Sequence, residues 1–351
     1  MAEQFEIEVE EEPFEDEVVE VFIDDEGIAS FGDEFDEDYA ISFGENIAEI
    51  LDESTRGELA SKITSYYHDD LDSRQDWYET FRDGLDLLGI KTNTRSEPFE
   101  GASGVYHPLL AEAVTHFQAQ TYRELLPAGG PVDTQVMGVT SDPKLEQANR
   151  VKNFMNYQLT YKMEEYDPEM DQMLFYLPLA GSAFKKSYYD PSVGRAVSRF
   201  VKAEDLVVPY TTNDLVTASR ITHVIRMTEN DLKKLQLSGF YRDVSMGSPS
   251  YIKQNDLQDK IDELEGVDRT GGDDEYTLLE VHGEFDLEGF EDKDENDEPT
   301  GLALPYIITV CLDTNEVLSI RQNYDPTDPM RRKVEYFTHY KFLPGLGFYG
   351  F

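Results

Sequence analysis

The sequence predicts an α+β fold in which a helical N-terminal half precedes a mixed, β-rich region. Apolar residues recur at helical spacing within residues 46–181, whereas residues 182–351 hold short β-branched and aromatic runs separated by turn residues. Residues 1–45 carry 19 acidic residues and no lysine or arginine. We therefore expect an acidic tail at 1–45, helices at 46–181 and a β-rich part at 182–351.

The acidic tail is predicted to be disordered, because its charges repel one another and it has no contiguous apolar face. Phenylalanine and valine nevertheless alternate with the acids, as in EIEVEEEPFEDEVVEVF. Such alternation also suits a segment that becomes ordered on a basic partner. The sequence leaves both interpretations open.

The overall composition argues against several classes of protein. The 351 residues carry a net charge of −43, which opposes tight, sequence-independent binding of a nucleic-acid backbone. A negative surface would instead let DNA slide past it. Cys311 is the single cysteine, so we expect no internal disulfide and a reducing compartment. We expect neither a secretory leader nor a membrane span, and hence an intracellular product.

Two helices are predicted at the start of the helical part. The first begins at Asn46 and is expected to be interrupted near Ser54 and Gly57, which are weak helix formers. The second begins near Asp72 and ends at Gly89. Its apolar face consists of Trp77, Phe81, Leu85 and Leu88.

A third helix follows a loop that spans residues 95–106. Pro108 suits its first turn, and Pro127 ends it after Leu126. The residues that this helix is expected to bury are Leu109, Leu110, Val114 and Phe117.

A fourth helix is predicted to begin near Pro143, and a fifth to run from Pro168 to about Leu177. The apolar face of the fourth consists of Leu145, Ala148, Val151, Met155, Leu159 and Met163. The apolar face of the fifth consists of Met170, Met173 and Leu174.

The β-rich part is predicted to hold strands joined partly by tight turns. Asp190 to Gly194 would form one turn and Thr314-Asn315 another. Thr228 is expected to cap a short helix that ends at Leu237, and a further helix is expected at 256–265. The extended runs are two strands within 182–201, then 204–210, 220–227, 275–287, 305–313, 316–324 and 334–342.

The sequence shows no catalytic or cofactor-binding constellation. His107, Glu112 and His116 come closest to a metal site, but the i, i+4 pair is Glu and His, which is most simply a surface pair. No GxxxxGK[ST], GxGxxG or GxSxG motif is present. The residues expected to be ordinary strand or core residues are His223, His282, His339 and Cys311.

Three short basic clusters are expected to be solvated rather than to contact DNA. They are Lys185-Lys186, Lys233-Lys234 and residues 331–333. Because Lys185 and Lys186 alternate in a strand, one of them should face out.

Several long motifs occur in an order that resembles the N-terminal region of portal proteins of tailed double-stranded DNA bacteriophages. They are SRQDWYETFRDGLDLLGI, RSEPFEGASGVYHPLLAEAVTHFQAQTYRELLPAGGPVDTQVMG, QANRVKNFMNYQLTYKMEEYDPEMDQMLFYLPLAGSAFKKSYYD, VKAEDLVVPY, EVHGEFDLEG, VLSIRQNY and FLPGLGFYGF. Together they cover nearly all of the chain after Asn46. The ordered series is specific, whereas each motif alone would be weak.

The resemblance implies a structural protein of the virion that is not an enzyme and needs no cofactor. It would form a homo-oligomeric ring, usually dodecameric, at one capsid vertex, after assembly in the host cytoplasm. Double-stranded DNA would pass through the ring without sequence-specific binding. Its partners would be the large terminase subunit, the major capsid and scaffolding proteins, and tail or adaptor proteins. The chain would form the wing and continue beyond Phe351 into the stem, clip and crown.

The resemblance also makes the segment from Ser96 to Pro131 a piece of scaffold. Its loop would hold Phe99 packed inside, with glycines at backbone angles that other residues avoid. The residues with an implied structural role are Trp77, Pro98, Phe99, Gly101, Gly104, Pro108, Phe117, Pro127, Gly129, Gly130 and Pro131. If Phe117 is a core residue, its replacement by alanine should cost roughly 3–5 kcal/mol.

Two alternatives stay open. One is another structural or assembly protein of a virion, such as an adaptor or an internal core protein. The other is a metal-dependent hydrolase within the α+β half.

Overall fold

The computed structural model describes residues 21–23, 29–31, 44–88, 99, 108–191, 193–247, 275–293, 298–328, 330–345 and 347–350. The chain divides into two compact units, Met1–Ser42 and Phe43–Phe351. In the first unit, β1 (Val21–Ile23) and β2 (Ala29–Phe31) pair antiparallel. The apolar residues of these two segments favour strands. Most of the remaining tail lies outside the described residues.

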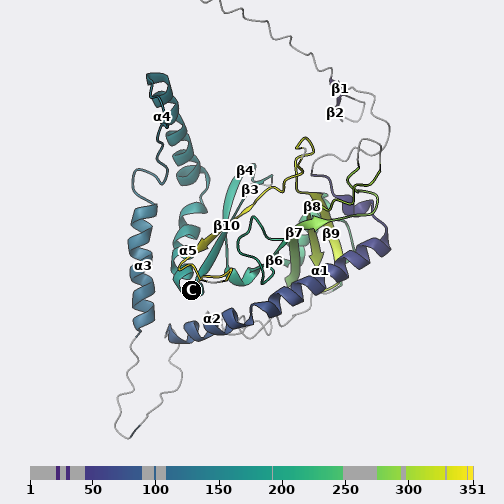
Figure 1. Ribbon diagram of the computed structural model, residues 1–351, viewed down its shortest axis with the longest axis horizontal. Coiled ribbons are helices and arrows are strands. Elements are labelled where there is room, and N and C mark those ends of the chain that lie inside the picture. Colours follow the sequence, from purple (N-terminus) through teal and green to yellow (C-terminus); the bar gives the residue numbers. More distant parts are fainter. Residues whose placement is uncertain are drawn as a thin grey trace, which may run out of the picture. The chain divides into compact units, whose positions relative to one another are not determined.

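The second unit combines helices with antiparallel sheets, which confirms the α+β class (Figure 1). Its first long helix, α1 (Glu53–Ser73), is capped by the Asp52 side chain. The interruption predicted near Ser54 and Gly57 is therefore wrong, because a capped helix tolerates a glycine that costs only about 1 kcal/mol. The break comes earlier, after the 3₁₀ turn η1 (Ile47–Glu49).

α2 (Gln75–Leu87) follows α1 after the single residue Arg74, and the two helices run along one side of the unit (Figure 1). The apolar face predicted for α2 is confirmed. Its members, the first half-buried and the others buried, are Trp77, Phe81, Leu85 and Leu88. The predicted end at Gly89 lies outside the described residues.

Three further helices follow: α3 (Leu109–Leu125), α4 (Asp142–Tyr157) and α5 (Tyr166–Ala180). Pro108 directly precedes α3 and Leu126 directly follows it, in agreement with the prediction. α4 continues into one π-helical turn, which is η2 (Gln158–Lys162). α3 packs against α5, and the predicted face of α5 is buried there. Its members are Met170, Met173 and Leu174.

The described strands of the second unit form two antiparallel sheets. The three-stranded sheet has the order β10 (Phe337–Lys341), β3 (Ser182–Asp190) and β4 (Arg195–Val201). The five-stranded sheet has the order β5 (Leu206–Val207), β6 (Arg220–Thr228), β7 (Glu275–Phe285), β8 (Leu304–Cys311) and β9 (Glu316–Gln322). Each coincides with a run predicted to be extended, apart from one extra residue at the end of β6 and one at the start of β8, which confirms those predictions.

Turns and caps also follow the predicted chemistry. The Thr228 hydroxyl accepts the backbone amide of Asp231 at 3.2 Å and so caps α6 (Glu229–Leu237). Asn315 has a φ of +55° in the turn between β8 and β9, a conformation that asparagine tolerates. The helix predicted at 256–265 lies outside the described residues.

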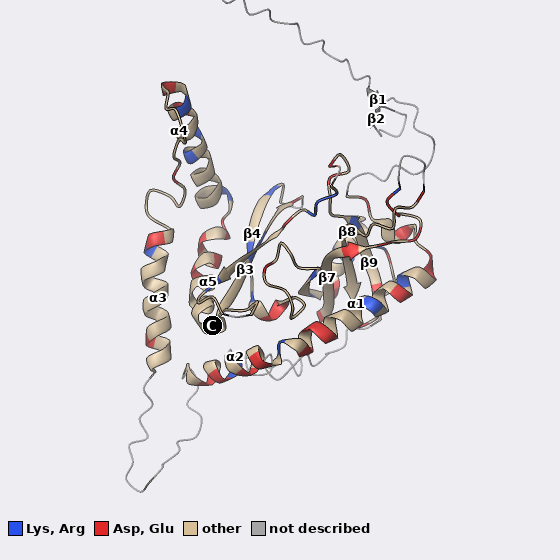
Figure 2. Ribbon diagram, in the orientation of Figure 1, with Lys and Arg blue, Asp and Glu red and all other residues tan. Residues whose placement is uncertain are grey.

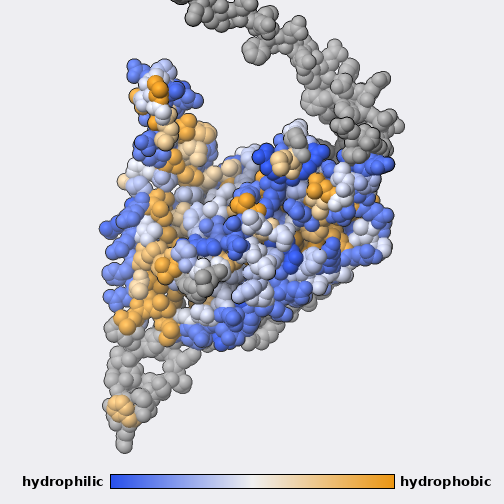
Figure 3. Space-filling model, in the orientation of Figure 1, coloured by the Kyte–Doolittle hydropathy of each residue, from blue (hydrophilic) through white to orange (hydrophobic). Residues whose placement is uncertain are grey.

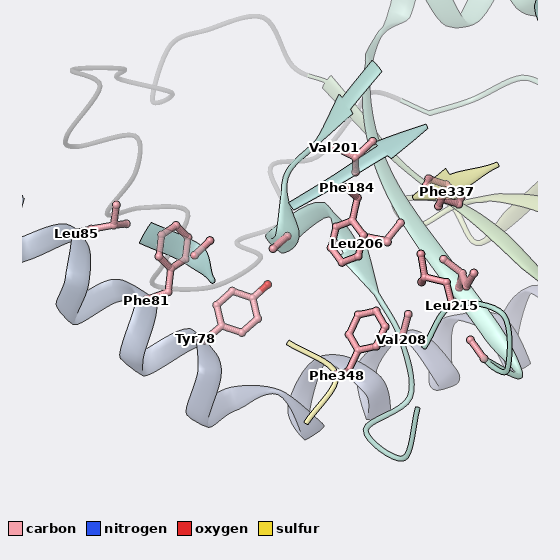
Figure 4. Packing of buried hydrophobic residues seen from close by; sticks show 14 residues of the cluster. Tyr78, Phe81, Leu85, Phe184, Val201, Leu206, Val208, Leu215, Phe337 and Phe348 are labelled. Atoms are coloured by element: carbon pink, nitrogen blue, oxygen red, sulfur yellow. The ribbon is translucent and has the colours of Figure 1, made fainter. Parts of the chain in front are cut away.

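The main core joins α2 to both sheets (Figure 4). Tyr78 and Phe81 of α2 share it with Phe184 of β3 and Leu206 of β5. Phe348, from the FLPGLGFYGF motif, packs into the same core. Cys311 is also buried, but in a separate cluster under the five-stranded sheet, which confirms its expected role as a small core residue.

Two predicted core residues instead lie at the surface. Phe99 is 69% exposed and Leu109 is 66% exposed. α3 packs on α5 with one stripe only, so Leu109, on its first turn, lies outside that contact. Val114 is buried as predicted, whereas Leu110 is half-buried.

Phe117→Ala should lower the free energy of unfolding by about 2 kcal/mol rather than by the full core value. Phe117 is only partly buried, although its ring makes an edge-on contact with Phe342 at 5.0 Å and packs on α5. Urea denaturation measures the change. Leu109→Ala is the matched control on the same helix, and a loss as large as that of Phe117→Ala would contradict this packing.

Candidate assembly surface

The connection between α3 and α4 turns sharply at residues 127–131, as predicted. Gly130 donates its N–H to the Pro127 carbonyl at 2.8 Å and has a φ of +96°. The chain then runs back along α4, where the Asn156 side chain bonds both the N–H and the C=O of Val132, at 2.9 and 3.0 Å. These bonds fix the connection on α4.

Gly130→Ala should lower the free energy of unfolding by about 2 kcal/mol. A side chain at this positive φ is strained, and its Cβ would overlap the Asn156 amide that holds Val132. Urea denaturation measures the loss. Gly129→Ala is the matched control, because a Cβ there meets no atom within 4 Å. Equal losses for the two variants would contradict the described turn.

Large apolar side chains lie exposed along α3, the connection and α4–η2 (Figure 3). None of the residues of α4 is buried, although the sequence gives it an apolar face. We call this set the α3–α4 apolar surface: Leu109, Leu125, Met137, Val139, Leu145, Val151, Phe154, Met155, Tyr157 and Tyr161. Contiguous apolar surface of this kind usually marks a contact with another molecule.

α4 and η2 carry net positive charge within a strongly acidic chain. From Asp142 to Lys162 there are four basic and two acidic residues, hence a net charge of +2, whereas the chain carries −43. The basic residues are Lys144, Arg150, Lys152 and Lys162. Arg150 is 72% exposed, and its acidic neighbour Glu146 lies 3.9 Å away.

The outer side of α1 and α2 is acidic (Figure 2). Six exposed acids follow one another at spacings of three or four residues, which places them on one side of the helices. We call them the acidic stripe: Asp69, Asp72, Asp76, Glu79, Asp83 and Asp86.

A groove of about 310 Å³ opens beside the acidic stripe. We call it the α2 groove. Its walls come from α2, the end of α5, residues 208–210 and residues 347–350. Trp77, Phe81, Leu179 and Tyr349 are among the residues that make its lining largely apolar, and Asp76 belongs to both the lining and the stripe. Tyr210 lines it as well and is 74% exposed.

Arg74, which lines this groove, donates hydrogen bonds to residues from distant parts of the chain. Its buried guanidinium donates to the carbonyls of Ala203, Glu204 and Leu206, at 2.8, 2.5 and 2.9 Å. It also donates to two phenol oxygens, those of Tyr78 at 2.5 Å and Tyr349 at 2.8 Å. Burial raises the pKa of Tyr78 to about 12, so this phenol stays neutral at physiological pH.

Trp77 makes a second connection between the same walls. Its indole N–H donates to the carbonyl of Ala180 at 2.9 Å, at the end of α5. Its ring stacks on Tyr349, with centroids 4.7 Å apart. The motif FLPGLGFYGF is therefore held against α2 by Arg74 and Trp77.

A buried ionic network lies between the two sheets. Glu280 of β7 pairs with Lys186 of β3 at 2.5 Å and accepts a hydrogen bond from His282 at 2.9 Å. His223 Nδ1 lies 3.6 Å from the same carboxylate oxygen, too far for a good hydrogen bond. Burial alone would raise the pKa of Glu280, but Lys186 and the hydrogen bond from His282 hold it well below its usual value.

Both lysines of the Lys185-Lys186 cluster are withdrawn from solvent, so the prediction that one faces out is wrong. Lys185 is buried under α5, with its Nζ 4.1 Å from the centroid of the Tyr166 ring. Lys186 points to the other sheet and meets Glu280. Both faces of β3 are covered, which strand alternation alone could not reveal.

His339 is half-buried on β10, in agreement with the expectation that it is an ordinary strand residue. Its ring stacks between Phe184 and Phe348, with centroids 4.4 and 4.6 Å away. Burial, together with the nearby charge of Lys341, lowers its pKa to about 3. The folded protein therefore keeps this imidazole neutral at a pH where the unfolded chain binds a proton.

Acidification from about pH 7 to about pH 5 should lower the free energy of unfolding by on the order of 2 kcal/mol through His339. The stabilisation is complete above the unfolded pKa of about 6.5 and is lost as the pH falls toward the folded pKa. Urea denaturation at several pH values measures it. His339→Gln should be less stable throughout but depend less on pH, and an unchanged pH dependence would contradict the assignment.

The residues considered for chemistry do not come together. Glu112 and His116 are both exposed on α3, and His107 lies outside the described residues. Among the side chains that the structure describes, no three of the His, Cys, Asp and Glu type are placed to hold a metal ion.

The residues with an implied structural role separate into two places. Pro108, Phe117 and the corner at 127–131 belong to the α3–α4 hairpin, and Trp77 lines the α2 groove. Pro98, Gly101 and Gly104 lie outside the described residues. Arg74 was not predicted from the sequence, although its position on the buried side of an apolar helical repeat was a usable signal.

No family model matches this chain, and no curated protein matches its sequence. Of the helices that the structure describes, none combines the length and apolarity needed to cross a bilayer.

Proposed function

We propose that the chain is a subunit of a phage portal, a structural ring at one capsid vertex. DNA would be packaged and ejected through its channel, and the large terminase subunit and then tail or adaptor proteins would dock on it. The α3–α4 apolar surface carries this proposal, because such a surface suits a permanent contact with further subunits. Among ring-forming proteins we favour a portal, because the ordered motifs of the sequence resemble those of portal proteins.

The distribution of charge supports passage of DNA rather than its capture. The acidic stripe and the net charge of −43 would repel a phosphate backbone. A channel built from such subunits would let the duplex slide, since it offers few fixed ion pairs to break.

The buried network around Glu280 favours a structural role over the hydrolase alternative. Its carboxylate is enclosed between two sheets and already paired with Lys186 and His282. The carboxylate is thus occupied by structural partners. A locked network of this kind fixes the two sheets relative to each other.

Mass photometry of the complete natural chain tests the proposal. We expect one dominant species with many times the monomer mass, and weak binding to duplex DNA at physiological salt. A chain that remains monomeric at every concentration and salt tested would overturn the proposal. Sequence-specific, tight binding to DNA would do the same.

A further inference from the structure

We infer that α4–η2 of one copy docks into the α2 groove of the next copy, beside the acidic stripe. This inference rests on the proposed function and names the partner of the α3–α4 apolar surface as a second copy of the same chain. Two surfaces that are far apart in the sequence would then meet head to tail.

α4–η2 and the α2 groove match in their apolar chemistry. α4–η2 presents exposed aromatic side chains, among them Phe154 and Tyr161, and Tyr157 stacks on Tyr161 with centroids 5.3 Å apart. The α2 groove is lined by aromatic rings, among them Trp77 and Tyr349. Aromatic side chains seated in a pocket are the usual anchors of a stable interface.

The two surfaces also match in charge. α4–η2 has a net charge of +2, and the groove lining includes Asp76, one of the six exposed acids of the stripe. Arg150 and Lys162 would come near Asp76 and Glu79 of the neighbour, which favours docking in this orientation. Pairing α4 with another α4 would bring two positive segments together, and pairing groove with groove would bring two acidic stripes together.

The symmetry of such a contact also favours a ring. Because the two surfaces differ, the contact is heterologous: each copy uses one surface toward one neighbour and the other surface toward the next. Such contacts close into rings when the rotation between copies permits. A self-complementary contact would stop at a dimer.

Charge reversal in the complete natural chain tests the inference. Arg150→Glu with Lys162→Glu reverses two charges on α4–η2, and Glu79→Lys with Asp83→Lys reverses two on the stripe. Each double variant should need at least about tenfold more protein for half-assembly in mass photometry. The variant with all four changes, and an equimolar mixture of the two double variants, should assemble nearly as well as the parent chain.

The matched control reverses the exposed lysines of α6, Lys233→Glu with Lys234→Glu, and should leave assembly unchanged. Circular dichroism confirms that each variant is folded. If the folded double variants assemble like the parent, this contact is overturned and the portal proposal stands. The same holds if the double variants lose assembly and the four-change variant does not restore it. A parent chain that never assembles would instead overturn the portal proposal and this inference with it. The inference would also be overturned if α4 binds duplex DNA and Arg150→Glu abolishes that binding while assembly stays intact.

A second experiment removes the aromatic anchors without changing charge. Phe154→Ser with Tyr161→Ser should raise the half-assembly concentration at least about tenfold. Leu237→Ser is the matched control, because Leu237 is 89% exposed but lies on α6. Equal effects of the anchor and control variants would show that α4 is not the docking element.

Discussion

Arg74→Ala should lower the free energy of unfolding by about 3–5 kcal/mol. The change leaves three buried carbonyls, those of residues 203, 204 and 206, without their donor. It also removes the donor to the Tyr349 phenol, so the FLPGLGFYGF motif should come loose from α2. Urea denaturation measures the stability, and hydrogen exchange at residues 347–350 measures the loosening.

Two variants show whether this effect belongs to the buried guanidinium. Arg74→Lys keeps the charge but not the planar fork, so it should recover less than half of the loss. Arg82→Ala removes an arginine of α2 that is 41% exposed and that pairs with Asp83 at 3.6 Å, so it should cost less than about 0.5 kcal/mol. A loss of less than about 1 kcal/mol in the free energy of unfolding of Arg74→Ala would contradict the stabilising role of the buried Arg74 hydrogen bonds.

Glu280→Gln should lower the free energy of unfolding by about 3 kcal/mol, because it leaves the Lys186 ammonium buried without a counter-charge. The change is nearly isosteric, so packing hardly alters. The pKa of Glu280 is held below its usual value, so its stabilisation is present above the unfolded pKa of about 4.3 and is lost as the pH falls below that value. The variant should lack this part of the acid sensitivity.

The matched changes separate a buried pair from an exposed one. Lys186→Met combined with Glu280→Gln should regain part of the stability, since no unpaired charge remains. Glu229→Gln breaks the exposed pair with Lys233 and should cost less than about 0.5 kcal/mol. If Glu280→Gln proved as mild as Glu229→Gln, the buried network would not stabilise the fold.

Much of the fold follows from local sequence signals. The periodicity of α2, the Thr228 cap and the Thr314-Asn315 turn each depend on neighbouring residues, and the structure has all three where they are predicted. The wrong prediction of a break at Ser54 and Gly57 also came from a local sequence signal. Propensity argued for a break there, but the cap at Asp52 outweighed it.

The candidate surface could be predicted only in part. Sequence periodicity identified the apolar face of α4 but could not tell whether the same chain covers it, because burial depends on distant elements. The α2 groove joins residues 74–81 to residues 347–350, a contact that no local pattern encodes. The prediction that Lys185 or Lys186 faces out was wrong for the same reason, since each lysine is covered by a different distant element.

Electron cryo-microscopy of the assembled complete chain tests the central claim most directly, namely that this protein acts by contact among identical copies. We expect a closed ring with a channel wide enough for duplex DNA, in which the α4–η2 density of each subunit lies in the α2 groove of the next. Particles without rotational symmetry, or a monomer whose α3–α4 apolar surface is covered by its own chain, would contradict the account.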